Sequence, residues 1–242
     1  MNVLDLFSGI GGFSLGLERA GFKTVAFCEV DKKCQAVLKK HWPDVPMFDD
    51  VSNLKGKDIE EKIDVICGGF PCQDISLAGK GAGLAGKRSG LWSEFHRLIE
   101  EIRPKYAIIE NVSALRSRGL DQVLRALSEI GYDAEWHCIT AASVGAPHRR
   151  DRIWIVAYAD NEGSQGWLYR WADKKRESEL GYLGRCSSVY GQPIQDQWSV
   201  EPDVGRVANG IPGRVDRLKQ LGNAVVPQIP QLIGMAIKEI EK

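Results

Sequence analysis

Three reactive side-chain types stand next to short apolar runs in this chain. Cys72 lies in the segment 68–76, Gly-Gly-Phe-Pro-Cys-Gln-Asp-Ile-Ser, directly after one apolar run, and Glu110 directly follows the next. Arg150 and Arg152 directly precede a third run. A thiolate is a nucleophile, a buried carboxyl can hold a proton, and arginines bind carbonyl oxygens. Together these types indicate covalent catalysis with a proton donor.

Each residue alone has an ordinary structural explanation. A single cysteine is most often a small core residue, and a glutamate after a strand is often a cap. The chemical prediction therefore depends on a fold that brings the three groups together.

The apolar pattern of the chain predicts that fold. Runs that indicate buried strands alternate with amphipathic helical stretches, which is typical of an α/β class with a parallel, doubly wound sheet covered on both faces. Strands are expected over 2–7, 23–29, 63–67, 106–109, 133–140 and 153–157, and helices up to residue 20, over 31–40, 91–102 and 120–130, and from about 224 to 239. Cys72 and Glu110 are then expected beside each other at one sheet edge.

The pattern changes at about residue 159. From there to about 205 the chain is rich in Gly, Ser, Gln and aromatic residues without a clear period. This predicts a small, irregular second domain over 159–205, inserted into a main domain formed by 1–158 and 206–242. Its aromatic side chains fill a small core of their own or stack on bases, and the sequence leaves both readings open.

A glycine-rich turn follows the first expected strand. Gly9, Gly11 and Gly12 allow close approach of a ligand to the backbone, but their spacing differs from the G-x-G-x-x-G of dinucleotide-binding proteins. Glu29, at the end of the second strand, suits two ribose hydroxyls, and Asp50 suits an adenine amino group. These residues indicate an adenosine-containing cofactor, or else a tight connection with two surface acids.

Composition narrows the classes of protein. The 242 residues carry 32 Lys/Arg and 32 Asp/Glu; residues 1–78 hold 9 basic and 12 acidic residues, net −3, and residues 79–118 hold 8 and 4, net +4. No apolar run is long enough to cross a membrane, and the start has no signal-peptide pattern. The six cysteines show neither C-x-x-C nor metal-ligand spacing, which predicts reduced thiols, a cytoplasmic location and no metal.

The sequence resembles the cytosine-C5 DNA methyltransferase family, of the prokaryotic or phage type. The motifs occur in family order over about 1–158 and 200–242, and the combination is specific although no single motif is. They read DLFSGIGG at 5–12, GFPCQ at 69–73, ENV at 110–112, RRDR at 149–152 and QLGNAVVP at 220–227.

The resemblance implies an AdoMet-dependent methyltransferase with a Rossmann-like fold that methylates carbon 5 of cytosine after flipping the base out of the duplex. It implies Cys72 as nucleophile, Glu110 as proton donor to N3, and Arg150 and Arg152 as carbonyl-binding residues. It also implies cofactor contacts from Phe7, Ser8, Gly9, Gly11, Gly12, Glu29, Val30, Asp50, Val51, Pro71, Leu91, Asn223 and Val225. DNA contacts are expected from Ser76, Lys80, Lys87, Arg88 and Arg206.

The expected partner is double-stranded DNA, with a restriction endonuclease or a second, target-recognising subunit as further candidates and a monomer as the default state. His148 stands where the family usually has Gln, and the 159–205 insert is short for target recognition.

The sequence leaves three alternative functions to compare with this one. An RNA methyltransferase of the tRNA-methylating branch would carry Cys-Phe-Thr, which is absent from this sequence. An AdoMet-binding protein without turnover of its own would need no complete catalytic set. A nicotinamide oxidoreductase would require a different glycine spacing.

Overall fold

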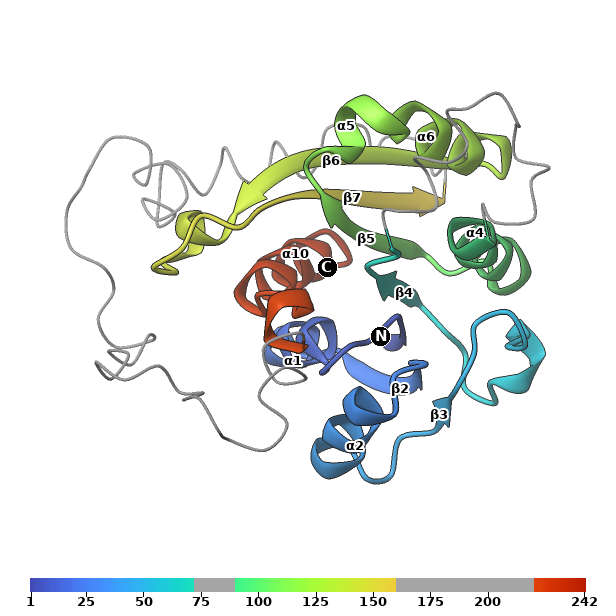
Figure 1. Ribbon diagram of the computed structural model, residues 1–242. Helices are drawn as coiled ribbons and strands as arrows, with labels where there is room; N and C mark the ends of the chain where they lie inside the picture. The colour runs from blue at the N-terminus through green and yellow to red at the C-terminus, as the bar shows by residue number, and fades with distance from the viewer. Residues whose placement is uncertain (72–89, 160–219) are drawn as a thin grey trace, which may run out of the picture.

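The computed structural model describes residues 1–71, 90–159 and 220–242, which contain one seven-stranded sheet (Figure 1). Its strand order is β3-β2-β1-β4-β5-β7-β6. The strands are β1 (Asn2–Leu6), β2 (Lys23–Cys28), β3 (Met47–Phe48), β4 (Val65–Gly68), β5 (Tyr106–Val112), β6 (Tyr132–Thr140) and β7 (Asp151–Ala159). The order reverses between β1 and β4, the position at which such sheets bind ligands. The predicted α/β class with a doubly wound, mostly parallel sheet is confirmed.

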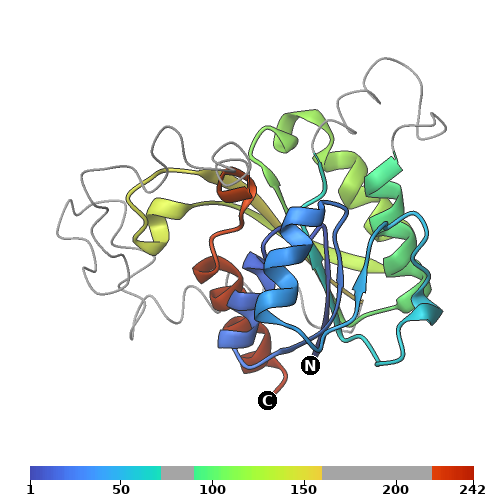
Figure 2. The ribbon, with the colours of Figure 1, turned by 60° about the horizontal axis from the view of Figure 1, so that its bottom comes forward.

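Helices cover both faces of the sheet, as Figure 2 shows from a second direction. One face is covered by α1 and α10, and the other by α4 and α6. The helices are α1 (Gly12–Arg19), α2 (Lys32–His41), α4 (Gly90–Ile102), α5 (Leu115–Arg118), α6 (Leu120–Glu129) and α10 (Gln228–Ile240), with short 3-10 turns η1 (Gly56–Asp58) and η2 (Ala141–Val144).

The side chains of the central strands alternate between the two faces of the sheet, and this produces two hydrophobic cores. Because successive strand residues point to opposite faces, β1 contributes Leu4 and Leu6 to one core and Val3 to the other. In β4 all four residues are buried, as expected for a parallel strand with helices on both sides. Because these strands are buried between helices, the positions of their carboxyl ends are fixed. The position of Gly69, which directly follows β4, is therefore fixed as well.

The structure corrects four details of the predicted elements. β7 runs antiparallel to both β5 and β6, so the sheet is not parallel throughout. β5 continues to Val112, so Glu110 lies within the strand rather than after it. α10 begins at Gln228, four residues later than expected, and α5 was not expected. In the described ranges no helix is long and apolar enough to span a membrane.

Close contact between α1 and α10 depends on glycine. A Cβ added to Gly16 would lie 2.2 Å from the carbonyl oxygen of Pro227, and one added to Gly12 would lie 2.5 Å from that of Val225. Any side chain at these positions would push the segment before α10 away from the first turn of α1. The two glycines therefore set the separation between the two helices.

Replacement of Gly16 by alanine should destabilise the fold. The added methyl group meets backbone, which cannot rotate away, and overpacking of this kind costs about 1–3 kcal/mol. Urea unfolding would measure the loss. Gly90→Ala is the control, because no residue with a described position lies within 4 Å of its added Cβ. Equal midpoints for the two variants would contradict this account of the α1–α10 contact.

Candidate active site

The antiparallel direction of β7 brings the arginine motif to the predicted site. Val112 pairs with Arg152, so the beginning of β7 lies beside the carboxyl end of β5. Arg152 Nε lies 3.0 Å from Glu110 Oε1, and the two side chains are only 23% and 12% exposed. A parallel β7 would have placed the arginines at the opposite edge of the sheet. The structure thus joins two of the predicted catalytic residues.

Two opposing effects act on the Glu110 carboxyl. Burial raises its pKa above the ordinary value, and the positive charges of Arg152 and Arg150 lower it, with burial the larger effect. A raised pKa favours the protonated form of a carboxylic acid near neutral pH. Glu110 is thereby suited to donate a proton, as the sequence predicted.

Asn111 fixes the segment that leads to the expected nucleophile. Its side chain is buried; Nδ2 donates to the carbonyl of Phe70 at 2.9 Å, and Oδ1 accepts from the backbone N–H of Val112 at 2.8 Å. A Cβ at Gly69 would lie 2.7 Å from Glu110 Oε2, so the chain passes directly over the carboxyl group. Cys72 itself lies outside the described residues. Sequence analysis missed Asn111, although its place beside Glu110 in the ENV motif was a usable signal.

Arg150 occupies a different position from Arg152. Its Nη1 donates to the carbonyl of Gly222 at 2.6 Å, and its φ of 30° is rare for a residue with a side chain. Burial and the charge of Arg152 lower its pKa, whereas Glu110 raises it. Arg150 therefore connects the beginning of β7 with the segment that carries the predicted cofactor residues Asn223 and Val225.

The glycine-rich turn after β1 is bound to the end of β2. Ser8 Oγ donates to the carbonyls of Asp5 and Cys28, and the N–H of Gly9 donates to Glu29 Oε2 at 2.7 Å. Phe7, just before them, has a φ of 52°, an unusual conformation of the kind that recurs at ligand sites. Glu29 is buried, and its other oxygen accepts from the N–H of Asp31. These contacts bring the predicted turn and the predicted ribose acid together.

The remaining predicted cofactor residues surround the same edge on neighbouring elements. Val30 is 75% exposed and Val51 is 4% exposed, while the Asp50 side chain accepts from the N–H of Ser52. Leu91 is half-buried in the first turn of α4, and Pro71 is exposed after β4. A buried acid, an exposed apolar side chain beside it and a glycine turn fit the ribose, the adenine and the methionine portion of AdoMet.

Arg97, which the sequence analysis did not single out, connects α4 to the Asp50 loop. Its Nη2 donates to the carbonyls of Val51 and Leu54, while Glu94 and Glu101 bind the same guanidinium. The loop and the middle of α4 are therefore held relative to each other.

Asp5 is a third residue whose role was not predicted from the sequence, after Asn111 and Arg97. It is fully buried; Oδ2 accepts from the N–H and the hydroxyl of Ser14, and Oδ1 has no hydrogen-bond partner in the described ranges. Burial, opposed by the bonds to Ser14, raises its pKa to about 7. Asp5 thus holds the first turn of α1 against β1, next to the glycine-rich turn.

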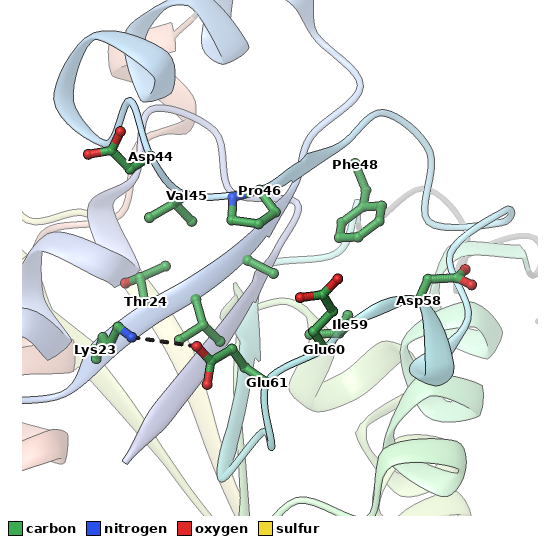
Figure 3. Close-up of a pocket in the computed structure, with 12 residues that line it drawn as sticks. Lys23, Thr24, Asp44, Val45, Pro46, Phe48, Asp58, Ile59, Glu60 and Glu61 are labelled. Atoms are coloured by element: carbon green, nitrogen blue, oxygen red, sulfur yellow. Dashed lines mark ion pairs between the residues drawn. The ribbon is translucent and has the colours of Figure 1, made fainter.

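A cavity of about 450 Å³ lies away from these residues, beside β2 and the loops before β3 and β4 (Figure 3). Its lining includes the apolar residues Val25, Pro46 and Ile59 and the acidic residues Glu60 and Glu61. No predicted site residue lines it, so it is separate from the candidate active site. The predicted DNA contacts Ser76, Lys80, Lys87, Arg88 and Arg206 lie outside the described residues.

Comparison with known proteins agrees with this geometry. The family model described as C-5 cytosine-specific DNA methylase matches residues 1–199. The type II methyltransferase M2.BsuMI of Bacillus subtilis is 39% identical over 165 residues, 65% of this chain and 42% of the relative. M.CviJI of Paramecium bursaria Chlorella virus IL3A is 40% identical over 156 residues, 64% of this chain and 42% of the relative. The chain thus spans less than half the length of these relatives.

A solved structure matches over the whole length. The crystal structure of the Schizosaccharomyces pombe Dnmt2 methyltransferase covers 100% of this chain and 99% of its own, with a TM-score of 0.66 and 15% identity. At that identity the likeness concerns the fold alone.

Removal of the Asn111 side chain should slow catalysis without weakening cofactor binding. Asn111→Ala removes the bond that holds Phe70, and misplacement of a reacting group by about 1 Å can cost on the order of 100-fold in rate. We expect a fall in kcat of about 10- to 100-fold at an unchanged AdoMet Kd. Asn2→Ala, which removes a similar bond to the Lys62 carbonyl, is the control. A normal kcat for Asn111→Ala would refute this positioning role.

The raised pKa of Asp5 should make stability depend on pH. A buried acid whose folded-state pKa is raised stabilises the fold least when ionised, so its contribution falls as pH rises from about 4 to about 7. Asp5→Asn keeps an oxygen for Ser14 but cannot ionise. Its unfolding free energy relative to the parent should therefore rise over that pH range. Parallel curves for the two proteins would show that Asp5 does not titrate in this way.

Proposed function

The chain belongs to the C-5 cytosine-specific DNA methylase family, and on that premise we propose that it transfers a methyl group from AdoMet to carbon 5 of cytosine in DNA. One observation carries the proposal above the others. Glu110, buried and paired with Arg152, lies against Gly69, three residues before Cys72. A nucleophile and a proton donor beside one arginine are what addition to a pyrimidine ring requires.

The proposed reaction begins with the base outside the duplex, because a stacked cytosine is out of reach. The Cys72 thiolate adds to C6, and the proton of Glu110 goes to N3, which removes the negative charge that develops on the ring. Arg152 orients the Glu110 carboxyl and binds the cytosine carbonyl. AdoMet, when bound, supplies the sulfonium methyl group that the activated C5 takes up. Loss of the C5 proton to a water molecule then allows the Cys72–C6 bond to break and the thiolate to leave, and the N3 proton returns to the Glu110 carboxylate.

We propose Glu29 as the ribose acid and Asp50 as the adenine contact. Phe7, Val30, Val51, Pro71 and Leu91 would then provide apolar contacts to the cofactor. Val225, which lies against Gly12, would close the pocket together with Asn223. This assignment is supported by the buried Glu29 carboxylate and by the turn that it binds.

Double-stranded DNA is the proposed substrate, and the names of the relatives suggest a restriction–modification setting with a restriction endonuclease as counterpart. For target recognition we propose either residues 159–205 or a second polypeptide. A monomeric catalytic chain is the simplest arrangement.

The direct test is transfer of labelled methyl from AdoMet to unmethylated duplex DNA, with RNA assayed alongside and the product base identified. We expect 5-methylcytosine in DNA, and its complete loss in Cys72→Ala with AdoMet binding retained. Product at the parent rate in Cys72→Ala would end this mechanism.

The pH dependence tests Glu110 separately. Because burial raises its pKa, the protonated form persists to higher pH than in an exposed glutamate, and transfer should decline once pH exceeds that raised value. Glu110→Gln keeps an oxygen for Arg152 but holds no transferable proton. It should be slower by about 100-fold or more and lack this decline. If the rate of methyl transfer by Glu110→Gln declines at high pH as it does in the parent, a group other than Glu110 causes the decline.

A further inference from the structure

The helix that follows Glu110 carries two exposed arginines. α5 begins three residues after β5 ends, and both Arg116 and Arg118 are exposed on it. Burial is the main cause that raises the pKa of the Cys138 thiol. The charge of Asp151 raises this pKa further, and the charge of Arg116 lowers it. Arg116 is therefore close to the end of β6 and the beginning of β7. The two arginines lie at the same sheet edge as Glu110.

A third exposed arginine continues this surface. Arg149 precedes β7 and is exposed, next to the half-buried Arg150. No carboxylate among the residues with described positions lies within 4.0 Å of Arg116, Arg118 or Arg149. Their side chains are exposed, and within the described ranges they form no ion pairs.

The charge at this edge of the sheet is divided between two halves. The half formed by β5, β6 and β7 carries five arginines, and its nearby acids are Glu110, Asp121 and Asp151, net +2. The half formed by β2 and β3 carries Glu29, Asp31, Asp49 and Asp50 against Lys32 and Lys33, net −2. A polyanion is attracted to the first half and repelled by the second.

From this placement we infer that Arg116 and Arg118, with Arg149 beside them, bind backbone phosphates of the DNA that flanks the flipped cytosine. The inference rests on the proposed function, since it assumes that the cytosine reaches Glu110. Arginine suits this role because its planar group binds phosphate oxygens in pairs. Such contacts set the position of the duplex without reading its sequence.

The test is the salt dependence of equilibrium binding of the full chain to a cytosine-containing DNA duplex. Each phosphate contact contributes about 0.9 to the slope of log K against log salt. Arg116→Ala combined with Arg118→Ala should lower that slope by about 1 to 2 and weaken binding equally for unrelated sequences. The corresponding double lysine variant should recover most of the slope because the charge is restored.

A matched control removes two charges elsewhere. Lys39→Ala combined with Lys40→Ala changes the last turn of α2, at the opposite end of that helix from Asp31, and should leave the slope unchanged. Thermal melting and AdoMet binding of each variant check that folding is intact. The inference would be overturned if the arginine variant showed the same slope of log K against log salt as the parent. It would also be overturned if the slope fell for binding to RNA but not for binding to DNA. Failure of the proposed function is a separate result, namely DNA binding by the parent with no methyl transfer.

Discussion

The pairing of β7 with β5 in opposite directions is the constraint on which the candidate site depends. It places Arg152 opposite Val112, and therefore within 3.0 Å of the Glu110 carboxyl. The same pairing aligns Arg150 with the segment before α10. Helix packing on both faces holds the strands, so backbone hydrogen bonds between β5 and β7 fix the positions from which the two side chains meet.

Glu110 illustrates how burial and charge are balanced. An arginine alone would keep the carboxylate ionised, and burial alone would leave an uncompensated polar group. With both present, the raised pKa favours a bound proton, and the guanidinium still fixes the direction of the group. The basic half of the sheet edge then adds a longer-range attraction for a polyanion, while the acidic half suits a cation such as a sulfonium.

The sequence predicted the class of fold and the grouping of Glu110 with the arginine motif. The class of fold is predictable because apolar runs that alternate with amphipathic helical stretches indicate an α/β sheet. The grouping holds only because β7 runs antiparallel to β5. Other features could not be predicted from the sequence. The direction of β7 depends on pairing between distant segments, and the bonds of Asn111, Arg150 and Asp5 depend on tertiary contacts that spacing does not encode. The places of Cys72 and of the 159–205 domain stay predictions.

The glycine contact between α1 and α10 has a consequence for biosynthesis. Gly16 lies against Pro230 and the Pro227 carbonyl, whereas its own helix leaves the ribosome long before those residues are made. During translation the α1 face that will receive α10 stays open to water, and Leu17 and Phe22 are without their later neighbour Gly234. A nascent chain is then a candidate for chaperone binding at that face until α10 emerges. Under the proposed function, an unfinished chain would also lack the segment around Val225, which lies against Gly12 and which we propose to close the cofactor pocket.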